Sequence, residues 1–232
     1  MENQTGKTYL ISFGGSLLMD DSMTFDIEFI KKFKILLDER IALGDKFVLI
    51  VGGGKTARYY QKAGRALGFD QETLDWIGIK STYLNADLVR LAFGAEDEVY
   101  HSPIKLPEVL EKSLYIVSGW KPGWSTDFVM VKAAKHLNAK TLINLSNTDY
   151  IYTADPNKDP EAKVLKFLTW KSYKEQMGIT EWTPGINVPF DPIASKLAEE
   201  IKANLHYLNG KNVENFSKFL KGEEHIASVI TA

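Results

Sequence analysis

A strand-like run that ends in three consecutive glycines and continues into a helix is the feature that most constrains the fold of this chain. Residues 47–50, Phe-Val-Leu-Ile, predict a buried strand, and residues 59–67 predict a helix. Gly52, Gly53 and Gly54 lie between them, where the lack of side chains lets backbone N–H groups approach a ligand closely. The helix start adds its positive dipole end at the same place. The turn therefore predicts a site for an anionic group, and phosphate is the expected one.

Two cationic side chains and a second glycine turn extend this prediction. Lys55 and Arg58 follow the triplet with a helical spacing of three, so both can face the turn. A second turn, Gly14-Gly15, follows another strand-like run at 9–13. Neither turn has the Gly-Lys-Ser/Thr end of a P-loop or the spaced glycines of the dinucleotide fingerprint. Two such turns indicate more than one phosphate group, although a glycine triplet alone is equally compatible with a plain turn.

Strand-like and helix-like segments alternate along most of the chain, which predicts an α/β fold with a mainly parallel sheet and helices on both faces. Sheets of this kind bind ligands at the carboxyl ends of their strands, where the glycine-rich and Ser/Thr/Asp-rich loops lie. The polar segment 146–162 is long enough to indicate a functional loop, and a second irregular stretch covers 178–192. The expected helices are 25–43, 59–67, 74–93, 125–137 and 191–204, and the expected strands are 9–13, 47–51, 115–117, 141–145, 206–208 and 228–230.

The overall composition excludes several classes of function. The formal net charge of -2 provides no global basic field for nucleic acid or an anionic membrane, so anion binding depends on local cations. The chain has no cysteine, which excludes disulfides, thiolate metal sites and cysteine nucleophiles. The first seven residues lack an apolar signal core, and no apolar run approaches the ~20 residues of a membrane helix. We therefore expect a cytoplasmic protein that acts on small molecules.

One polar helix start and two tryptophans are further candidates. Ser125, Thr126 and Asp127 supply the hydroxyls and the carboxylate of a first helical turn, and Asp127 is as compatible with a capping role as with catalysis. Trp120 and Trp124 flank a short loop, and they either pack beneath it or face a ligand. The four histidines share no metal-ligand spacing, so structural roles are favoured and no metal site made by the protein alone is predicted.

Seven motifs follow one another in a fixed order, mostly in the loops described above. They are Phe-Gly-Gly-Ser at 13–16, Val-Gly-Gly-Gly-Lys-Thr-Ala-Arg at 51–58, Asp-Trp-Ile-Gly-Ile at 75–79, Thr82 with Asn85 and Ala86, Gly-Trp-Lys-Pro-Gly-Trp-Ser-Thr-Asp at 119–127, the segment 146–160, and Pro-Phe-Asp-Pro-Ile-Ala-Ser-Lys at 189–196. In this order they resemble the amino acid kinase superfamily, and most closely the archaeal type of its uridylate kinase branch. The match extends from Leu10 to about Leu208, nearly the whole chain.

The resemblance implies a three-layer α/β/α sandwich in one domain, 1–232, in which about 1–140 binds the phosphoryl acceptor and about 141–232 binds ATP. It also implies a kinase that uses ATP and Mg²⁺, with UMP as the acceptor and UDP as the product, and a homo-oligomer of six chains by family analogy. Carried over by motif, the catalytic set is Lys55, Arg58 and Asp127, the acceptor-binding set is Gly53, Asp75, Trp120, Lys121, Pro122, Gly123, Trp124, Ser125 and Thr126, and the ATP-binding set is Gly14, Gly15, Gly54, Ser146, Asn147, Tyr152 and Asp155.

Several positions near these ligands depart from the family's usual residues. Ser12 stands where many members carry a lysine, although the archaeal uridylate kinases also lack that lysine. The other departures are Tyr150 for a glycine of the ATP loop, Trp120 and Trp124 for smaller residues, Tyr83 for an arginine, and Ile226-Ala227-Ser228 for a Gly-Thr pair. Two alternatives to a UMP kinase therefore stay open: a storage or regulatory protein with a nucleotide-type cleft, like the molybdenum storage proteins, and a kinase of another small phosphate or carboxylate.

Overall fold

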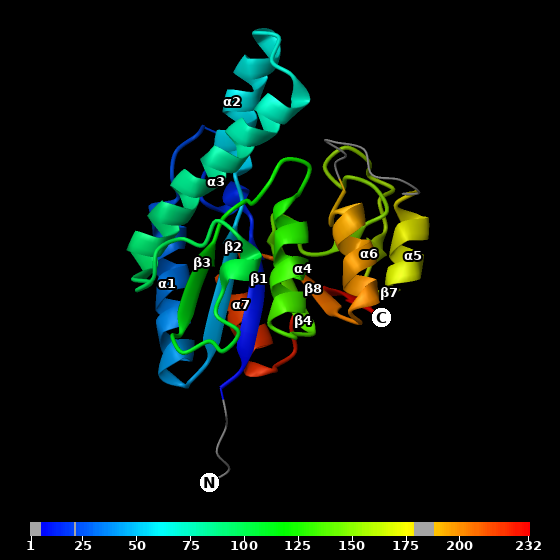
Figure 1. The fold of residues 1–232 in the computed structure, drawn as a ribbon. Coiled ribbons are helices and arrows are strands. Elements are labelled where there is room, and N and C mark those ends of the chain that lie inside the picture. The colour runs from blue at the N-terminus through cyan, green and yellow to red at the C-terminus, as the bar shows by residue number, and fades with distance from the viewer. Residues whose placement is uncertain (1–5, 21, 179–187) are drawn as a thin grey trace.

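A seven-stranded sheet lies between two layers of helices, which confirms the predicted α/β sandwich (Figure 1). The computed structural model describes residues 6–20, 22–178 and 188–232, and the structural statements below refer to these residues. The strands of the sheet are β1 (Thr8–Phe13), β2 (Lys46–Val51), β3 (Leu114–Val117), β4 (Thr141–Ser146), β7 (Phe167–Thr169), β8 (Asn204–Asn209) and β9 (Ser228–Thr231).

The strand order is β3-β2-β1-β4-β8-β9-β7, and the five strands from β3 to β8 are parallel. β9 pairs antiparallel with β8 and parallel with β7, so these two short strands run the opposite way. A separate hairpin, β5 (Ile151–Tyr152) with β6 (Val164–Leu165), lies within and just after the segment predicted as a long functional loop. The parallel register brings the carboxyl ends of β1, β2, β3, β4 and β8 to one edge of the sheet.

The side chains of each central strand alternate between two separate cores. Ile11 and Phe13 of β1 pack with helices α1 (Ile27–Ala42), α3 (Gln71–Phe93) and α7 (Val213–Lys221) on one face. Leu10 of β1 packs on the other face with α4 (Thr126–His136), α5 (Trp170–Gln176) and α6 (Pro192–Glu200). Strands with an apolar residue on both sides are typical of a sheet covered by helices on both faces.

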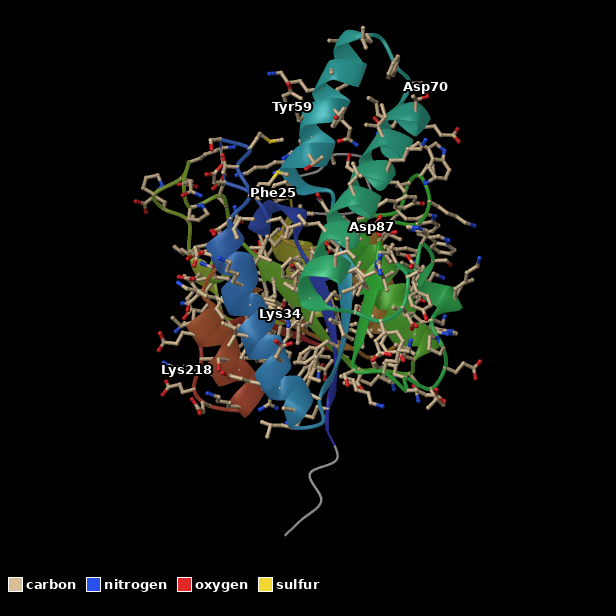
Figure 2. All side chains as sticks on the ribbon, turned by 90° about the vertical axis from the view of Figure 1, so that its left-hand side faces the viewer. Phe25, Lys34, Tyr59, Asp70, Asp87 and Lys218 are labelled. Atoms are coloured by element: carbon tan, nitrogen blue, oxygen red, sulfur yellow. The ribbon has the colours of Figure 1, made fainter. Side chains whose placement is uncertain are left out.

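Helix α2 (Gly54–Ala66) and the first half of α3 form a hairpin that projects beyond this edge of the sheet (Figure 1). Figure 2 shows the hairpin from the side, with Tyr59 on α2 and Asp70 just before α3. The helices pack closely at Gly64, where an added Cβ would lie 2.7 Å from Leu74. The amide nitrogen of Gln61 also donates to the carbonyl of Leu74 at 3.0 Å. These contacts make the hairpin a fixed wall above the strand ends.

Several predicted boundaries differ from the structure. α2 begins at Gly54, five residues before the predicted start, because the helix continues directly from the glycine turn. α3 begins at Gln71, where the Asp70 carboxylate accepts from the backbone N–H of Thr73. α6 ends at Glu200 rather than 204, since Lys202 takes a positive φ and turns the chain into β8. The sequence pattern did not predict β5, β6, β7, α5 or α7, and residues 179–187 of the stretch predicted as irregular lie outside the described part of the chain.

Candidate active site

A cavity of about 450 Å³ opens at the carboxyl edge of the sheet. The α2–α3 hairpin forms one wall, and the loop 119–125 with the first residues of α4 and α6 forms the other. The residues predicted from motifs that line it are Gly53, Gly54, Arg58, Asp75, Lys121, Gly123, Trp124, Ser125, Thr126 and Asp127. The residues that line it without having been predicted include Gln61, Arg65, Gln71, Gly78, Thr82, Gly119, Asp191 and Pro192.

The two glycine turns are packed against each other at the base of this cavity. A Cβ on Gly15 would overlap the carbonyl oxygen of Gly52 and lie 2.6 Å from the nitrogen of Gly54. Gly54 has φ +55°, a conformation that side chains disfavour. Gly14 lies close to the end of β4, since a Cβ added to it would lie 3.2 Å from the carbonyl oxygen of Leu145. The glycines therefore permit a close approach of three strand ends, and they place the start of α2 beside the first turn.

A buried amide on α3 fixes the orientation of the triplet. The Asn85 side chain is almost completely buried, and its amide nitrogen donates to the carbonyls of Gly52 at 2.9 Å and Gly53 at 3.1 Å. Holding these two carbonyls on the α3 side fixes the peptide planes at the start of α2. The sequence contains Asn85 in a recognisable motif, but the motif alone gave no role for it.

Asp127 is the second residue of α4, and the capping role belongs to its neighbour. Ser125 is the N-cap, because its hydroxyl accepts from the backbone N–H of Phe128 at 3.1 Å. The Asp127 carboxylate accepts from the hydroxyl of Ser12 at 3.0 Å and from the backbone N–H of Asp191 at 3.3 Å. Burial, together with the charge of Asp191, raises the pKa of Asp127 to about 7, while the two hydrogen bonds oppose the rise. Asp127 is therefore not the N-cap of α4, and it lies at the cavity wall as a carboxyl group with a raised pKa.

The turn that carries Asp191 is held from behind by a tyrosine. The Tyr173 hydroxyl accepts from the backbone N–H of Phe190 and donates to the carbonyl of the same residue, both at 2.8 Å. The Asp191 carboxylate caps α6 by accepting from the backbone N–H of Ala194 at 2.7 Å. These contacts hold Asp191 beside Asp127. The motif at 189–196 was recognised in the sequence, but Asp191 was not assigned to the site.

The loop 119–125 is attached to α3 at two points. The backbone N–H of Gly123 donates to one carboxylate oxygen of Asp75 at 2.9 Å, and the amide of Gln71 donates to the other at 2.7 Å. The backbone N–H of Gly119 donates to the hydroxyl of Thr82 at 2.7 Å. The loop is therefore positioned across the cavity before any ligand binds.

The two tryptophans of this loop have different surroundings. Trp124 lines the cavity, is 37% exposed, and stacks on Phe128 with ring centroids 3.9 Å apart. Trp120 packs against the core on the α4 side, and the Lys121 ammonium lies 4.7 Å from its ring centroid. Neither Trp120 nor Pro122 is among the lining residues. The packing alternative therefore describes Trp120, whereas Trp124 both packs and faces the cavity.

The predicted ATP-binding residues lie beside the cavity, at the carboxyl ends of β4 and β8. Ser146 accepts at 2.7 Å from the hydroxyl of Tyr207, which also contacts Thr148 at 2.8 Å. The amide of Asn209 donates to Asp149 at 2.9 Å. These contacts tie the loop after β4 to the end of β8, next to the first glycine turn.

The remaining residues of this set lie further along the same segment. Tyr152 is in β5, with its ring edge-on to that of Tyr150 at 6.5 Å. Asp155 accepts from the backbone N–H of Asn157 at 3.0 Å, as in a turn, and this bond is the main cause of its lowered pKa. Lys55 lies in the first turn of α2 but is not among the residues that line the cavity.

Comparison with known proteins decides the family. The model of the amino acid kinase family matches residues 7–209. The chain belongs to the amino acid kinase family. A uridylate kinase of Methanobrevibacter smithii is 32% identical over 227 residues, which cover 96% of this chain and 98% of that protein. A uridylate kinase of Archaeoglobus fulgidus is 34% identical over 218 residues, which cover 92% of this chain and 95% of that protein.

Solved structures agree with this assignment. The crystal structure of the Archaeoglobus fulgidus uridylate kinase superposes with a TM-score of 0.80 at 31% identity, covering 97% of this chain and all of that one. A UMP kinase of Bacillus anthracis superposes with a TM-score of 0.78 at 20% identity, which shows a shared fold. The amino acid kinase architecture therefore extends over nearly the whole chain.

Within this amino acid kinase fold, the described residues contain no group of three or more His, Cys, Asp or Glu side chains that could hold a metal ion. No helix in the described residues is long and apolar enough to cross a membrane. Among the residues described, Asp127 is the one carboxyl group at the cavity whose pKa is strongly raised, and Asp191 lies beside it. A metal at this place would need oxygen ligands from a substrate as well as from the protein.

Proposed function

We propose that this protein is an ATP-dependent nucleoside monophosphate kinase that phosphorylates UMP to UDP. The observation that carries the proposal is the convergence of three helix starts, those of α2, α4 and α6, on one cavity that also contains Arg58 and the Asp127–Asp191 pair. Helix N-termini bind phosphate groups, and phosphoryl transfer depends mainly on positioning and on neutralising charge. The names of the relatives, all uridylate kinases, support the same reaction.

The acceptor nucleotide occupies the cavity in this proposal. Its phosphate lies at the Gly53–Gly54 turn, where Arg58 donates a charge-assisted pair of hydrogen bonds. Asp75 holds the ribose, and the loop 119–125 encloses the base. Since Asp75 already fixes Gly123, ribose binding and loop position are coupled through one carboxylate. Holding the two reactants in line is the main contribution of such a site.

The acidic pair suits a magnesium ion bound together with ATP. Mg²⁺ usually takes one or two protein carboxylates and fills its other positions with phosphate oxygens and water. Asp127 and Asp191 fit this donor set, because burial and their mutual repulsion disfavour two negative charges without a cation. Mg²⁺ at this place would neutralise charge on the transferred phosphoryl group. Ser12 and the backbone N–H of Asp191 orient the Asp127 carboxylate for that role.

ATP is proposed to lie along the other half of the strand edge, in contact with Gly14, Gly15, Ser146, Asn147, Tyr152 and Asp155, and to reach Gly54 with its phosphates. This divides the domain into an acceptor part, about 1–140, and an ATP part, about 141–232. Lys55, in the first turn of α2, is proposed to contribute positive charge near the transferred group. A hexameric assembly and a cytoplasmic location stay predictions from the family analogy and from the sequence.

The alternative functions are not favoured. The relatives that match across nearly the whole chain are uridylate kinases, and the cavity retains the helix starts, the arginine and the acidic pair that phosphoryl transfer needs. The departures at Trp124 and Tyr150 change the surroundings of the nucleotides, not the elements that hold the phosphates.

An assay of ADP formation with a panel of nucleoside monophosphates tests the proposal. UMP with ATP and Mg²⁺ is expected to give the highest kcat/KM, well above AMP and GMP, because the relatives that match this chain are uridylate kinases. Equal turnover of all acceptors, or turnover only of a non-nucleotide phosphate, would contradict the assignment of UMP.

A further inference from the structure

The cavity-facing side of α2 carries three long polar side chains with different partners. Arg58, Gln61 and Arg65 are spaced by three and four residues, and all three line the cavity. Gln61 is engaged, because its amide donates to the carbonyl of Leu74. Arg65 makes no side-chain hydrogen bond or ion pair with any residue that the structure describes. Its guanidinium is therefore available to a molecule in the cavity.

Asp75, which also lines the cavity, makes no ion pair with Arg65. Its two carboxylate oxygens accept from the amide of Gln71 and from the backbone N–H of Gly123. Lys121, another cation that lines the cavity, lies over the ring of Trp120. At the outer end of the α2–α3 hairpin, the guanidinium of Arg65 thus makes no hydrogen bond or ion pair within the described part of the chain.

The spacing along α2 corresponds to the length of a nucleotide. Seven residues of α-helix span about 10.5 Å, which is close to the distance from the phosphate of a pyrimidine nucleotide to the far edge of its base. Arg58 lies one turn from the glycine turn, at the proposed phosphate position. Asp75, the proposed ribose ligand, directly follows Leu74, which contacts Gln61 and Gly64 of α2, so it lies between the levels of Arg58 and the hairpin tip. A nucleotide extended along the hairpin therefore brings its base to Arg65.

The chemistry of guanidinium distinguishes the two pyrimidines. Arginine only donates hydrogen bonds and cannot accept one. Uracil carries an acceptor oxygen at its 4-position, as thymine does, whereas cytosine carries an amino donor there. A site built to donate to this position pairs with uracil and leaves two donors facing each other with cytosine. Rejection of an analogue that leaves polar groups unpaired is stronger than rejection by shape alone.

We propose that Arg65 donates to the 4-oxygen of the acceptor's uracil and thereby determines the preference for UMP over CMP. The inference rests on the proposed function, because it takes UMP as the acceptor. It assigns to Arg65 a specificity role that is separate from phosphate binding by Arg58. The reacting phosphate lies two helical turns away, so the contact acts on binding and not on the chemical step.

Arg65→Met tests the proposal, with Lys62→Met as its matched control. Both changes replace an exposed cation of α2 by a neutral, unbranched side chain, but Lys62 does not line the cavity. Arg65→Met is expected to lower kcat/KM for UMP about tenfold through KM, to leave kcat within twofold, and to reduce the UMP/CMP preference by a similar factor. Lys62→Met is expected to leave all three quantities unchanged.

A UMP analogue with hydrogen in place of the 4-oxygen removes the acceptor atom that Arg65 is proposed to bind, and it also turns N3 from a donor into an acceptor. The wild type is expected to use this analogue at least tenfold less efficiently than UMP, and Arg65→Met is expected to show a difference about tenfold smaller than that of the wild type. If Arg65→Met keeps the wild-type UMP/CMP ratio, or loses efficiency equally for UMP and the analogue, Arg65 is not the base-reading residue, although the kinase assignment stands. If the wild type does not phosphorylate UMP at all, the proposed function fails before any variant is made.

Discussion

Asn85 holds the carbonyl of Gly52 through a 2.9 Å hydrogen bond from its buried amide, so the middle of α3 fixes the turn at the end of β2. The same amide also binds the carbonyl of Gly53. Because α3 also carries Asp75 and Thr82, one helix positions both the turn Gly52–Gly54 and the loop 119–125. The proposed placement of the acceptor's phosphate and nucleoside therefore depends on α3 as a rigid element.

Replacing Asn85 by alanine should affect both stability and turnover. The buried carbonyl of Gly52 loses its partner, which costs about 1–3 kcal/mol in the free energy of unfolding, and the turn loses its fixed orientation. We expect kcat to fall at least tenfold at saturating substrates. Asn215→Ala is the matched control, since Asn215 is equally buried and makes two hydrogen bonds to the backbone of Ile226 on the far side of the protein. A similar loss of kcat in both variants would reduce the role of Asn85 to general stability.

Arg58→Ala should lower kcat/KM for UMP by about 10²-fold or more and leave the melting temperature within a few degrees. Arg58 has no ion pair or hydrogen bond to lose within the described chain, so its removal costs little folding energy. Arg58→Lys should recover only part of the activity, because lysine lacks the planar pair of donors that suits a phosphate. Full activity of a folded Arg58→Ala protein would show that the reaction does not need Arg58.

Asp127→Asn should depress kcat by about 10²-fold or more, and it should also change the pH dependence of stability. The folded-state pKa of about 7 exceeds the unfolded value of 3.8, so the folded protein binds more protons between these values. Stability of the ligand-free wild type therefore falls as pH rises from about 4 to 7, and is lowest above 7. The asparagine variant lacks this loss and should be more stable at pH 8, on the order of 1–3 kcal/mol. Thermal melts of both proteins at pH 5 and pH 8 check the sign, and a pH-independent difference would contradict it.

Trp124→Ala should raise KM for UMP about tenfold, because it removes an aromatic wall of the cavity, and UMP should quench wild-type tryptophan emission. Stacking of a base on an aromatic ring contributes about 1–3 kcal/mol in other proteins. Trp120→Phe serves as the control, since Trp120 packs on the core and does not line the cavity. Quenching that survives in Trp124→Phe but disappears in Trp120→Phe would reverse the assignment of the two rings.

The sequence predicted the central fold well, because its signals there are local. Apolar runs followed by glycines mark β1 and β2, and Gly44 and Gly94, both with positive φ, end α1 and α3 where the pattern places these ends. Short elements such as α5 and β7 were missed. They span only a few residues and depend on tertiary contacts, such as the hydrogen bonds of Tyr173 to Phe190.

The residues of the candidate site were likewise predicted only in part from the sequence. Gly53, Asp75 and Asp127 were assigned to the site from their motifs, and the structure brings all three to one cavity. Asn85, Asp191 and Arg65 were not assigned roles, because their importance depends on which carbonyl, carboxylate or cavity each one faces. Periodicity places a side chain on a helix face, but only the packed fold shows its partner across the chain.

Transfer of labelled phosphate is the most direct test of the central claim. The purified protein is incubated with γ-³²P-ATP, Mg²⁺ and UMP, and the products are separated by chromatography, with Asp127→Asn in parallel. The account predicts that the label appears in UDP with the wild type and is reduced about 10²-fold or more with the variant. Label that remains in ATP, or that appears only as inorganic phosphate in the presence of saturating UMP, would contradict the assignment of this cavity to phosphoryl transfer between nucleotides.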